Sequence, residues 1–209
     1  MIVSMSFSIV SWIITQIISF LEYSGYFGVF SLMTLESMLL PIPSEVILPF
    51  AGYLVYRGSM NMILAILAGT LGGLAGSLIS YGIGYYGGRP FIIKFGRYIL
   101  IREQELSVVE NWFKKYGSLS VFLTRLVPIF RTFISIPAGI GEMNILKFTI
   151  YTALGSLIWS IVLVYLGFML GNNWVVIFRF FGELDYVVYA VAIAIILYLG
   201  YRAYKAWKK

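Results

Sequence analysis

Residues 38–52 read MLLPIPSEVILPFAG, and residues 125–139 read RLVPIFRTFISIPAG. The two stretches are copies of one pattern, because Pro41 aligns with Pro128 and Gly52 with Gly139 at a single offset. Each copy places charged residues beside a proline break within apolar sequence. After a gap of four residues, three more glycine pairs align: Gly72 with Gly155, Gly84 with Gly167, and Gly88 with Gly171. The chain therefore contains an internal duplication.

The composition is that of an integral membrane protein. Of the 209 residues, 60% are apolar and 11% are charged, whereas soluble domains carry about 25% charged residues. A membrane span needs about 20 apolar residues, so the chain can hold a small helical bundle, and we expect one membrane domain over residues 1–209. No basic residue precedes Arg57 and no small-residue cleavage site follows the first apolar run, so we expect the first helix to be retained.

Several kinds of chemistry are excluded by residues that the chain lacks. It has no cysteine and no histidine, and Asp185 is the only aspartate. A histidine nucleophile and disulfides are therefore absent, and metal-dependent phosphotransfer has too few carboxylates. We predict no catalytic residue, no metal site and no cofactor, so an enzyme such as a membrane lipid phosphatase ranks well below a transporter.

Basic residues concentrate in two regions, residues 89–115 and residues 202–209. Both regions flank apolar segments and contain interfacial aromatics, which favours anchoring at the membrane surface over nucleic-acid binding. By the positive-inside rule both should be cytoplasmic. We therefore expect a multi-pass protein with a cytoplasmic C-terminus and no nucleic-acid partner, with homo-oligomerisation left open.

The apolar pattern divides the chain into five segments. Residues 1–24 form an N-terminal helix, of which residues 1–21 either span the membrane or lie along its surface. Two repeats follow, separated by a cytoplasmic amphipathic connector, and a final segment holds a return loop, a last transmembrane helix and the basic tail. The boundaries of these later segments are residues 25–88, 89–117, 118–171 and 172–209.

Each repeat is expected to pair a re-entrant hairpin with a transmembrane helix. The arms around Pro41 and Pro43 have about a dozen residues, or ~18 Å of helix, which reaches only partway across a bilayer. Broken backbone at membrane depth must face protein or a water-filled cavity. Ser44 is the predicted N-cap of the second arm, with Glu45 in its first turn. The second hairpin covers residues 118–141 around Pro128, and the spans cover residues 62–86 and 144–171.

Counting spans gives the relation between the repeats. If each hairpin returns to the side it entered, only one span separates the two hairpins, so the repeats have opposite orientations. The predicted fold is thus an all-α inverted repeat, an architecture in which transporters place the substrate site at the repeat interface. The first span also carries small residues at every fourth position, which we expect to serve helix packing. This row comprises Gly72, Gly76, Ser80, Gly84 and Gly88.

The two copies carry opposite charge. Glu36 and Glu45 flank the first break, whereas Arg125 and Arg131 flank the second, with Thr132 just beyond. Ionised groups at membrane depth are usually functional, because leaving water costs them several kcal/mol. The planar fork of arginine suits phosphate, and a helix N-terminus near Thr132 would add N–H donors. We predict that Arg125, Arg131 and Thr132 bind an anionic headgroup.

Glu36 and Glu45 are the predicted proton-coupling and gating residues. They lie on opposite arms of the first hairpin, so their protonation would depend on whether an arginine or another carboxylate is nearer. That dependence is what a proton-coupled gate requires. The alternative is a structural ion-pair network in which the four charged residues hold the hairpins together without transport.

The same residues carry a family resemblance. Glu36 followed by Pro41-Ile-Pro43-Ser44-Glu45, and Phe122-x-x-Arg125-x-x-Pro128-x-x-Arg131-Thr132 followed by Pro137-Ala138-Gly139, closely resemble the paired motifs of the DedA family of membrane proteins. The resemblance covers residues 25–171. One departure is Thr124, where many members have glycine or serine.

The resemblance implies a substrate and a location. DedA proteins are implicated in returning undecaprenyl phosphate across the bacterial cytoplasmic membrane with dependence on the proton motive force, and distant relatives are lipid scramblases. The leading prediction is a polyprenyl-phosphate translocase in which the two arginines hold the phosphate and the two glutamates couple movement to protons. A nonspecific phospholipid scramblase, a small-ion or proton exchanger and a structural assembly factor remain as alternatives.

Overall fold

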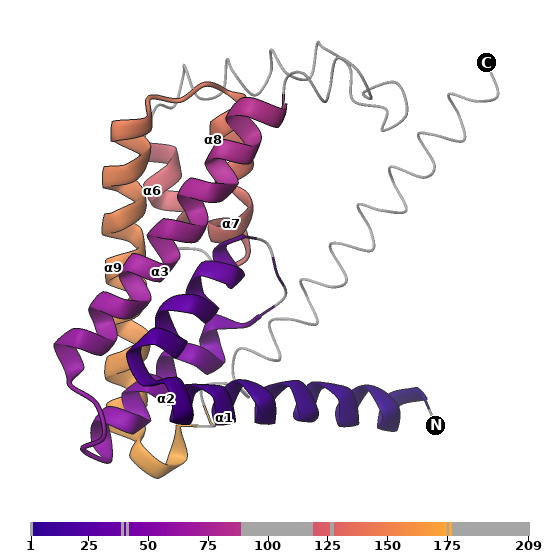
Figure 1. Ribbon diagram of the computed structural model, residues 1–209, viewed down its shortest axis with the longest axis vertical. Coiled ribbons are helices and arrows are strands. Elements are labelled where there is room, and N and C mark those ends of the chain that lie inside the picture. The colour runs from indigo at the N-terminus through magenta and orange to yellow at the C-terminus, as the bar shows by residue number, and fades with distance from the viewer. Residues whose placement is uncertain are drawn as a thin grey trace.

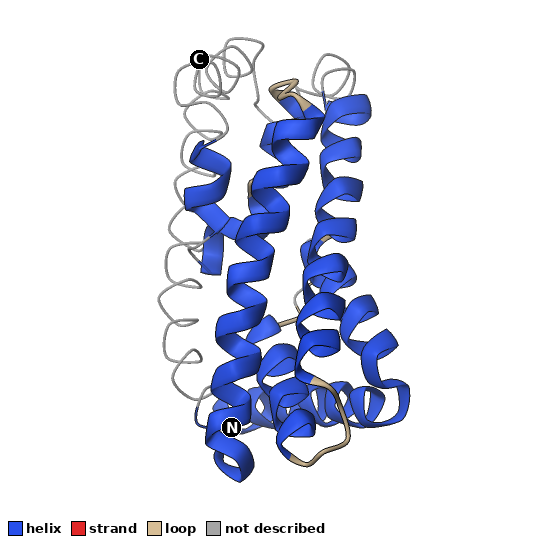
Figure 2. Cartoon of the chain, turned by 90° about the vertical axis from the view of Figure 1, so that its left-hand side faces the viewer, coloured by secondary structure: helices blue, strands red, loops and turns tan. Residues whose placement is uncertain are grey.

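Helices account for the regular secondary structure of the described residues. The computed structural model describes residues 2–38, 40, 42–88, 119–125, 128–174 and 176. Within these ranges the chain forms helices and loops and no strand (Figure 2). The predicted all-α class is confirmed. The predicted connector, Pro41, and the last helix with its basic tail lie outside the described residues.

The first helix, α1 (Ile2–Ser37), changes direction at Gly25. The φ of 56° and ψ of −129° at Gly25 are non-helical, and only glycine adopts such values without steric cost. Before the bend the helix runs across the lower end of the bundle, and after it residues 26–37 rise beside α3 (Met62–Gly82) (Figure 1). If α3 crosses a membrane, this transverse course favours the surface position for residues 1–21.

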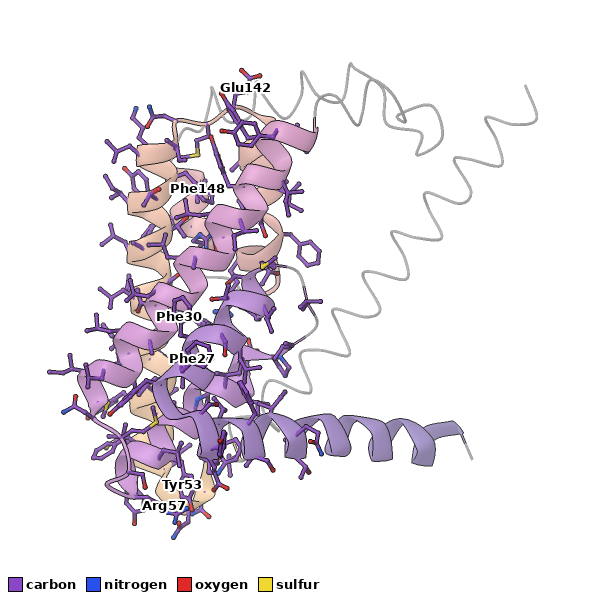
Figure 3. The ribbon with its side chains drawn as sticks, viewed as in Figure 1. Phe27, Phe30, Tyr53, Arg57, Glu142 and Phe148 are labelled. Atoms are coloured by element: carbon purple, nitrogen blue, oxygen red, sulfur yellow. The ribbon has the colours of Figure 1, made fainter. Side chains whose placement is uncertain are left out.

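Two short helical hairpins approach the centre of the bundle from opposite ends (Figure 1). In the first, residues 26–37 of α1 rise to the centre and α2 (Ser44–Tyr56) returns to the lower end. In the second, α6 (Leu119–Arg125) leads down to α7 (Pro128–Phe133), and α8 (Ser135–Ile140) returns to the upper end. Arg57 and Glu142, which follow the two hairpins, accordingly lie at opposite ends of the molecule (Figure 3).

The predicted N-cap of α2 is wrong by one residue. Pro43 holds the N-cap position with φ −78° and ψ 119°, and no side chain caps this helix end. Ser44 is the first helical residue, and its Oγ donates to Oε2 of Glu45 at 3.1 Å instead of accepting from the backbone. Proline fixes φ near the value that a chain entering a helix needs, so the helix begins directly after it. Glu45 does lie in the first turn, as predicted.

Two of the described helices are long and apolar enough to cross a membrane. One is α3 with its π-helical continuation η1 (Ile83–Gly88), and the other is α9 (Ile145–Leu170), which ends in a 3₁₀ turn, η2 (Gly171–Asn173). Asparagine side chains cap both starts: Asn61 accepts from two backbone N–H groups of α3, and Asn144 accepts from Lys147 of α9. These helices match the predicted spans at residues 62–86 and 144–171.

Glycines bring the first hairpin into backbone contact with α9. A Cβ placed on Gly52 of α2 would overlap the carbonyl oxygen of Val164. On the opposing helix, a Cβ on Gly167 would overlap the carbonyl oxygen of Pro49. The two helices therefore touch through a reciprocal pair of glycines that no larger residue could replace without moving the backbone.

The second hairpin uses the corresponding glycines against α3. A Cβ on Gly139 of α8 would overlap the carbonyl oxygen of Tyr81, and one on Gly84 would overlap that of Ile136. In the sequence alignment these two glycines correspond to the pair that joins α2 and α9. The second arm of each hairpin thus packs against the long helix of the other half of the chain.

The predicted small-residue row of α3 lies against α1 over its first part and against α8 further along. Cβ atoms on Gly72 and Gly76 would overlap carbonyl oxygens of α1, and Ser80 Oγ donates to the carbonyl oxygen of Ser37 at 2.9 Å. Gly84 continues the row into η1, where α8 replaces α1 as the neighbour, and Gly88 is the last residue of η1. The row positions the hairpins against the span.

Replacing Gly167 with alanine should destabilise the protein by about 1–3 kcal/mol, because the methyl group must push the α2 backbone away from α9. Gly82→Ala is the matched control: no atom lies within 4 Å of its added Cβ, and alanine favours a helix over glycine by roughly 1 kcal/mol. Unfolding in detergent followed by circular dichroism measures both. Equal stabilities of the two variants would contradict the close packing.

Candidate functional site

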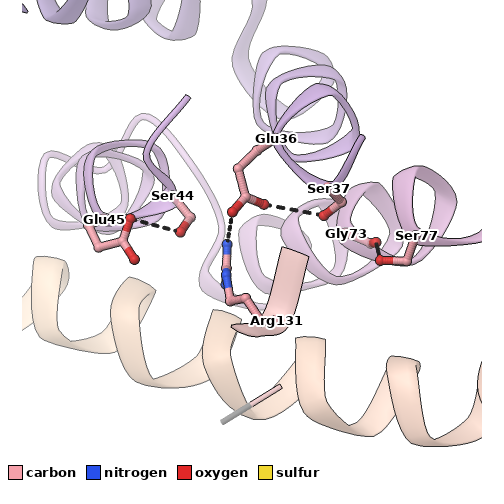
Figure 4. A network of polar contacts seen from close by, with 7 residues as sticks. All are labelled: Glu36, Ser37, Ser44, Glu45, Gly73, Ser77 and Arg131. Carbon is pink, nitrogen blue, oxygen red and sulfur yellow. Dashed lines mark hydrogen bonds and ion pairs between the residues drawn. The ribbon is translucent and has the colours of Figure 1, made fainter. Parts of the chain in front are cut away.

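A buried ion pair joins the tips of the two hairpins. Nη2 of Arg131 in α7 lies 2.5 Å from Oε1 of Glu36, near the end of α1, and each side chain is only 8% exposed. The other carboxylate oxygen of Glu36 accepts from Ser37 Oγ at 3.2 Å (Figure 4). Both oxygens therefore have a donor, as a carboxylate removed from water requires. The structure brings these two predicted site residues, 95 positions apart, into contact.

Arg125, the last residue of α6, lies at the same site and is 4% exposed. Its Nη2 donates to Ser135 Oγ at 3.0 Å, whereas its Nε is buried without a hydrogen-bond partner. Among the described residues, no carboxylate lies within 4.0 Å of this guanidinium. Its side-chain stem fits beside Gly155 of α9, where an added Cβ would lie 2.8 Å from Arg125 Cβ. Arg125 thus has unused capacity to bind an anion.

Helix α9 supplies an aromatic ring to each guanidinium. The Arg125 guanidinium lies 5.6 Å from the ring centroid of Phe148, and that of Arg131 lies 5.1 Å from the ring of Trp159. Eleven residues separate the two aromatics, which is about three helical turns, so both are on one face of α9. Cations within about 6 Å of a ring face are attracted by its quadrupole.

A small cavity lies between the two arginines. Its volume is about 10 Å³, close to what one water molecule needs. Its lining comes from both hairpins and both long helices. The residues that contribute polar or aromatic groups are Ser37, Arg125, Arg131, Thr132, Ser156 and Trp159.

Two other predicted site residues are Glu45 and Thr132. Glu45 is half-buried in the first turn of α2, and its side chain accepts a hydrogen bond from Ser44 Oγ (Figure 4). Thr132 lines the cavity from inside α7, and the helix start that follows it is that of α8 at Ser135.

Several site residues escaped the sequence analysis. Ser37, Ser135, Phe148, Ser156 and Trp159 carry no charge and stand in ordinary apolar or small-residue stretches. Their role depends on which helices pack together, and a single sequence does not show that. The alignment of the two copies offered one signal for Trp159, because this large residue stands where the first copy has Gly76 of the small-residue row.

Arg131→Met should lower the free energy of unfolding by about 3–5 kcal/mol, because it leaves Glu36 buried without its cation. The double variant Arg131→Met, Glu36→Met removes both charges and should recover most of that loss. Arg57→Met is the control: it breaks the ion pair with Glu22, whose side chains are 51% and 50% exposed, and should cost about 1 kcal/mol or less. Chemical unfolding in detergent gives these values, and strictly additive losses in the double variant would argue against a coupled pair.

The chain is similar to a known protein family and to several proteins with names. Residues 42–169 match the VTT domain family. Undecaprenyl phosphate transporter A of Bacillus subtilis (strain 168) is 44% identical over 162 residues, which cover 78% of this chain and 80% of that protein. The protein of the same name from Staphylococcus aureus (strain NCTC 8325 / PS 47) is 32% identical over 192 residues, with 90% and 95% covered. No solved structure matches the chain.

A more distant relative carries the family name itself. Protein DedA of Escherichia coli (strain K12) is 27% identical over 133 residues, which cover 63% of this chain and 60% of that protein. The transporter names of the two nearer relatives agree with the prediction of a membrane transport protein. The family model, matched over residues 42–169, covers more than half of the chain. The chain therefore belongs to the VTT-domain, or DedA, family of membrane proteins.

Proposed function

We propose that the protein moves a polyprenyl phosphate, in particular undecaprenyl phosphate, across the bacterial cytoplasmic membrane. The observation that carries this proposal is the pair of buried guanidiniums at one cavity, of which only Arg131 has a carboxylate partner among the described residues. With Glu36 ionised, these three residues leave one uncompensated positive charge away from water. An entering phosphate would supply the missing negative charge.

The two arginines offer different contacts to a headgroup. Arg125 presents an unbonded Nε–H, and Arg131 presents a fork that now faces Glu36. A phosphate that bridges them would use charge-assisted bonds to both, with hydroxyls such as Thr132 completing the shell. The prenyl chain would stay in lipid beside the glycine-rich span. Because the present cavity holds about one water, the hairpin tips must separate before a headgroup enters.

Alternating separation of the two hairpins would expose the site to each side in turn. The reuse of corresponding glycines at the two ends of the bundle supports an inverted repeat of re-entrant hairpins. The crossing of α3 and α9 supports it as well. There Gly73 faces Ser156, its counterpart in the alignment, so a twofold relation would pass through this contact. In this arrangement the first hairpin opens outward and the second opens to the cytoplasm, with the C-terminus inside.

Protons would drive the exchange of Glu36 for phosphate at Arg131. Glu36 and an incoming phosphate compete for the same guanidinium, so protonation of Glu36 would release Arg131 to the phosphate. Deprotonation would restore the pair and expel the headgroup. Glu45, half-buried on the other arm of the hairpin, is the second carboxylate available to this site.

Transport is tested with purified protein in liposomes that contain labelled undecaprenyl phosphate. Arg125→Lys and Arg131→Lys keep the charge but lose the planar fork, so each should slow flipping by about tenfold or more. Labelled phosphatidylglycerol serves as the comparison lipid. Wild-type flipping in the double Lys variant would remove the arginines from the mechanism, and equal wild-type rates for both lipids would favour a nonspecific scramblase.

Proton coupling is tested in the same liposomes with a pH gradient. Glutamine mimics a protonated carboxyl group, so the Glu36→Gln, Glu45→Gln double variant should still bind lipid but should lose the dependence of flipping on pH. Glu22→Gln is the control, because this glutamate pairs with Arg57 on the exposed surface and should leave the pH profile unchanged. An unchanged profile in the double variant would reduce the two glutamates to structural partners.

A further inference from the structure

We propose that Trp159 is a positioning residue of the headgroup site: its indole ring keeps the Arg131 guanidinium in the cavity when Glu36 no longer pairs with it. The inference rests on the proposed function, since it takes Arg131 to be a phosphate ligand. It adds a residue from the long helix α9 to a site whose charged groups all come from the hairpins.

Arg131 is held from two directions. Glu36 approaches from α1 at 2.5 Å, and the face of Trp159 lies 5.1 Å from the guanidinium on the side of α9. The contact with Trp159 borders the cavity, because Arg131 and Trp159 line it together. A phosphate that binds Arg131 must displace or share Glu36. After that exchange, Trp159 is the remaining contact among those described for this guanidinium.

A long arginine side chain without such a contact would lose its position. Arginine carries about 2 kcal/mol of rotamer entropy, so a released guanidinium samples many orientations unless another group restrains it. The indole ring is the strongest cation–π partner among the aromatic side chains. Because it belongs to α9, it does not move with the first hairpin when Glu36 withdraws.

The two copies of the duplication show that the fold itself does not require an indole here. The position equivalent to Trp159 in the first copy is Gly76, and the position equivalent to Arg131 is Ser44. A Cβ on Gly76 would overlap the carbonyl oxygen of Thr34, so that half of the molecule has no room for a side chain. Arginine and tryptophan thus occur together in one half and are both missing from the other.

The contacts of Arg125 explain why tryptophan, the stronger cation–π partner, lies beside Arg131 and phenylalanine lies beside Arg125. Arg125 already donates to Ser135 within its own hairpin, and its stem is enclosed beside Gly155, so its guanidinium stays in place without an ion pair. The ring beneath it is Phe148, at 5.6 Å. Arg131 exchanges its anionic partner during the proposed cycle, and it therefore depends more on its ring.

The test measures binding of farnesyl phosphate, a short polyprenyl phosphate, to the full-length protein in detergent, with farnesol and inorganic phosphate as comparison ligands. Trp159→Leu should weaken farnesyl phosphate binding by about 5- to 30-fold, the range expected from a desolvated cation–π contact. Trp159→Phe should retain much of the affinity, and farnesol binding should not change. Trp174→Leu is the matched control, since this buried indole packs against Phe50 and Tyr53 away from both arginines.

Fluorinated tryptophan separates the electrostatic role from a packing role. Fluorine withdraws charge from the ring face with little change in shape, so affinity should fall stepwise from unlabelled to monofluorinated to difluorinated protein. Labelling reaches all five tryptophans, so the Trp159→Phe chain labelled in the same way is the control and should show no trend. If Trp159→Leu fails to fold, this series still tests whether the cation–π contact of Trp159 supports headgroup binding.

The outcomes distinguish the inference from the proposed function. If the wild-type protein binds farnesol as tightly as farnesyl phosphate, the phosphate role of the arginines fails and the inference fails with it. If the wild type prefers the phosphate but neither Trp159→Leu nor fluorination alters the affinity, the proposed function stands and the positioning role of Trp159 is rejected. Preference for inorganic phosphate over farnesyl phosphate would assign the site to a soluble anion.

Discussion

The burial of opposite charges between two hairpin tips is the constraint on which the rest of the site depends. Glu36 and Arg131 each leave water to meet at 2.5 Å, and either one alone would cost several kcal/mol in apolar surroundings. In the proposed cycle, the tips would therefore separate when another anion takes over Arg131 or when a proton neutralises Glu36. This requirement would link opening of the structure to the phosphate and the protons of the proposed transport.

The contacts that hold the surrounding helices together differ in kind from the contact that joins the hairpin tips. Reciprocal glycine contacts join α2 to α9 and α8 to α3, and these contacts are backbone to backbone. Such interfaces have two well-packed faces and no long side chains to rearrange, so they resist small distortions. Within the part of the chain that the structure describes, the Glu36–Arg131 ion pair joins the tips beside a cavity of about 10 Å³. Movement should therefore begin at the tips, while the glycine contacts act as the fixed ends of each hairpin.

Sequence alone predicted the parts that follow from periodicity and charge. The sequence could be read directly for the duplication, the two long spans and the four charged residues. The length of an apolar segment and the presence of a charged residue within it are local properties of the sequence. The N-cap at Ser44 was wrong because a proline one residue earlier fixes the helix start. The partnership of Glu36 with Arg131 rather than Arg125, and the rings under both guanidiniums, depend on contacts across as many as 95 positions, which local pattern does not encode.

Because the two arginines have different partners, the proposed cycle couples headgroup binding at Arg131 to protonation of Glu36. Arg125 donates to Ser135 of its own hairpin, whereas Arg131 donates to Glu36, with which a new anion would compete. If phosphate takes Arg131, Ser37 Oγ is the contact that remains to the buried Glu36 among those described, and such a setting would favour the neutral acid. In the proposed cycle, binding of the headgroup would then promote uptake of a proton by Glu36. By linkage, protonation of Glu36 must strengthen headgroup binding by the same factor, so one shared guanidinium is sufficient to couple the two without any other connection between proton and lipid.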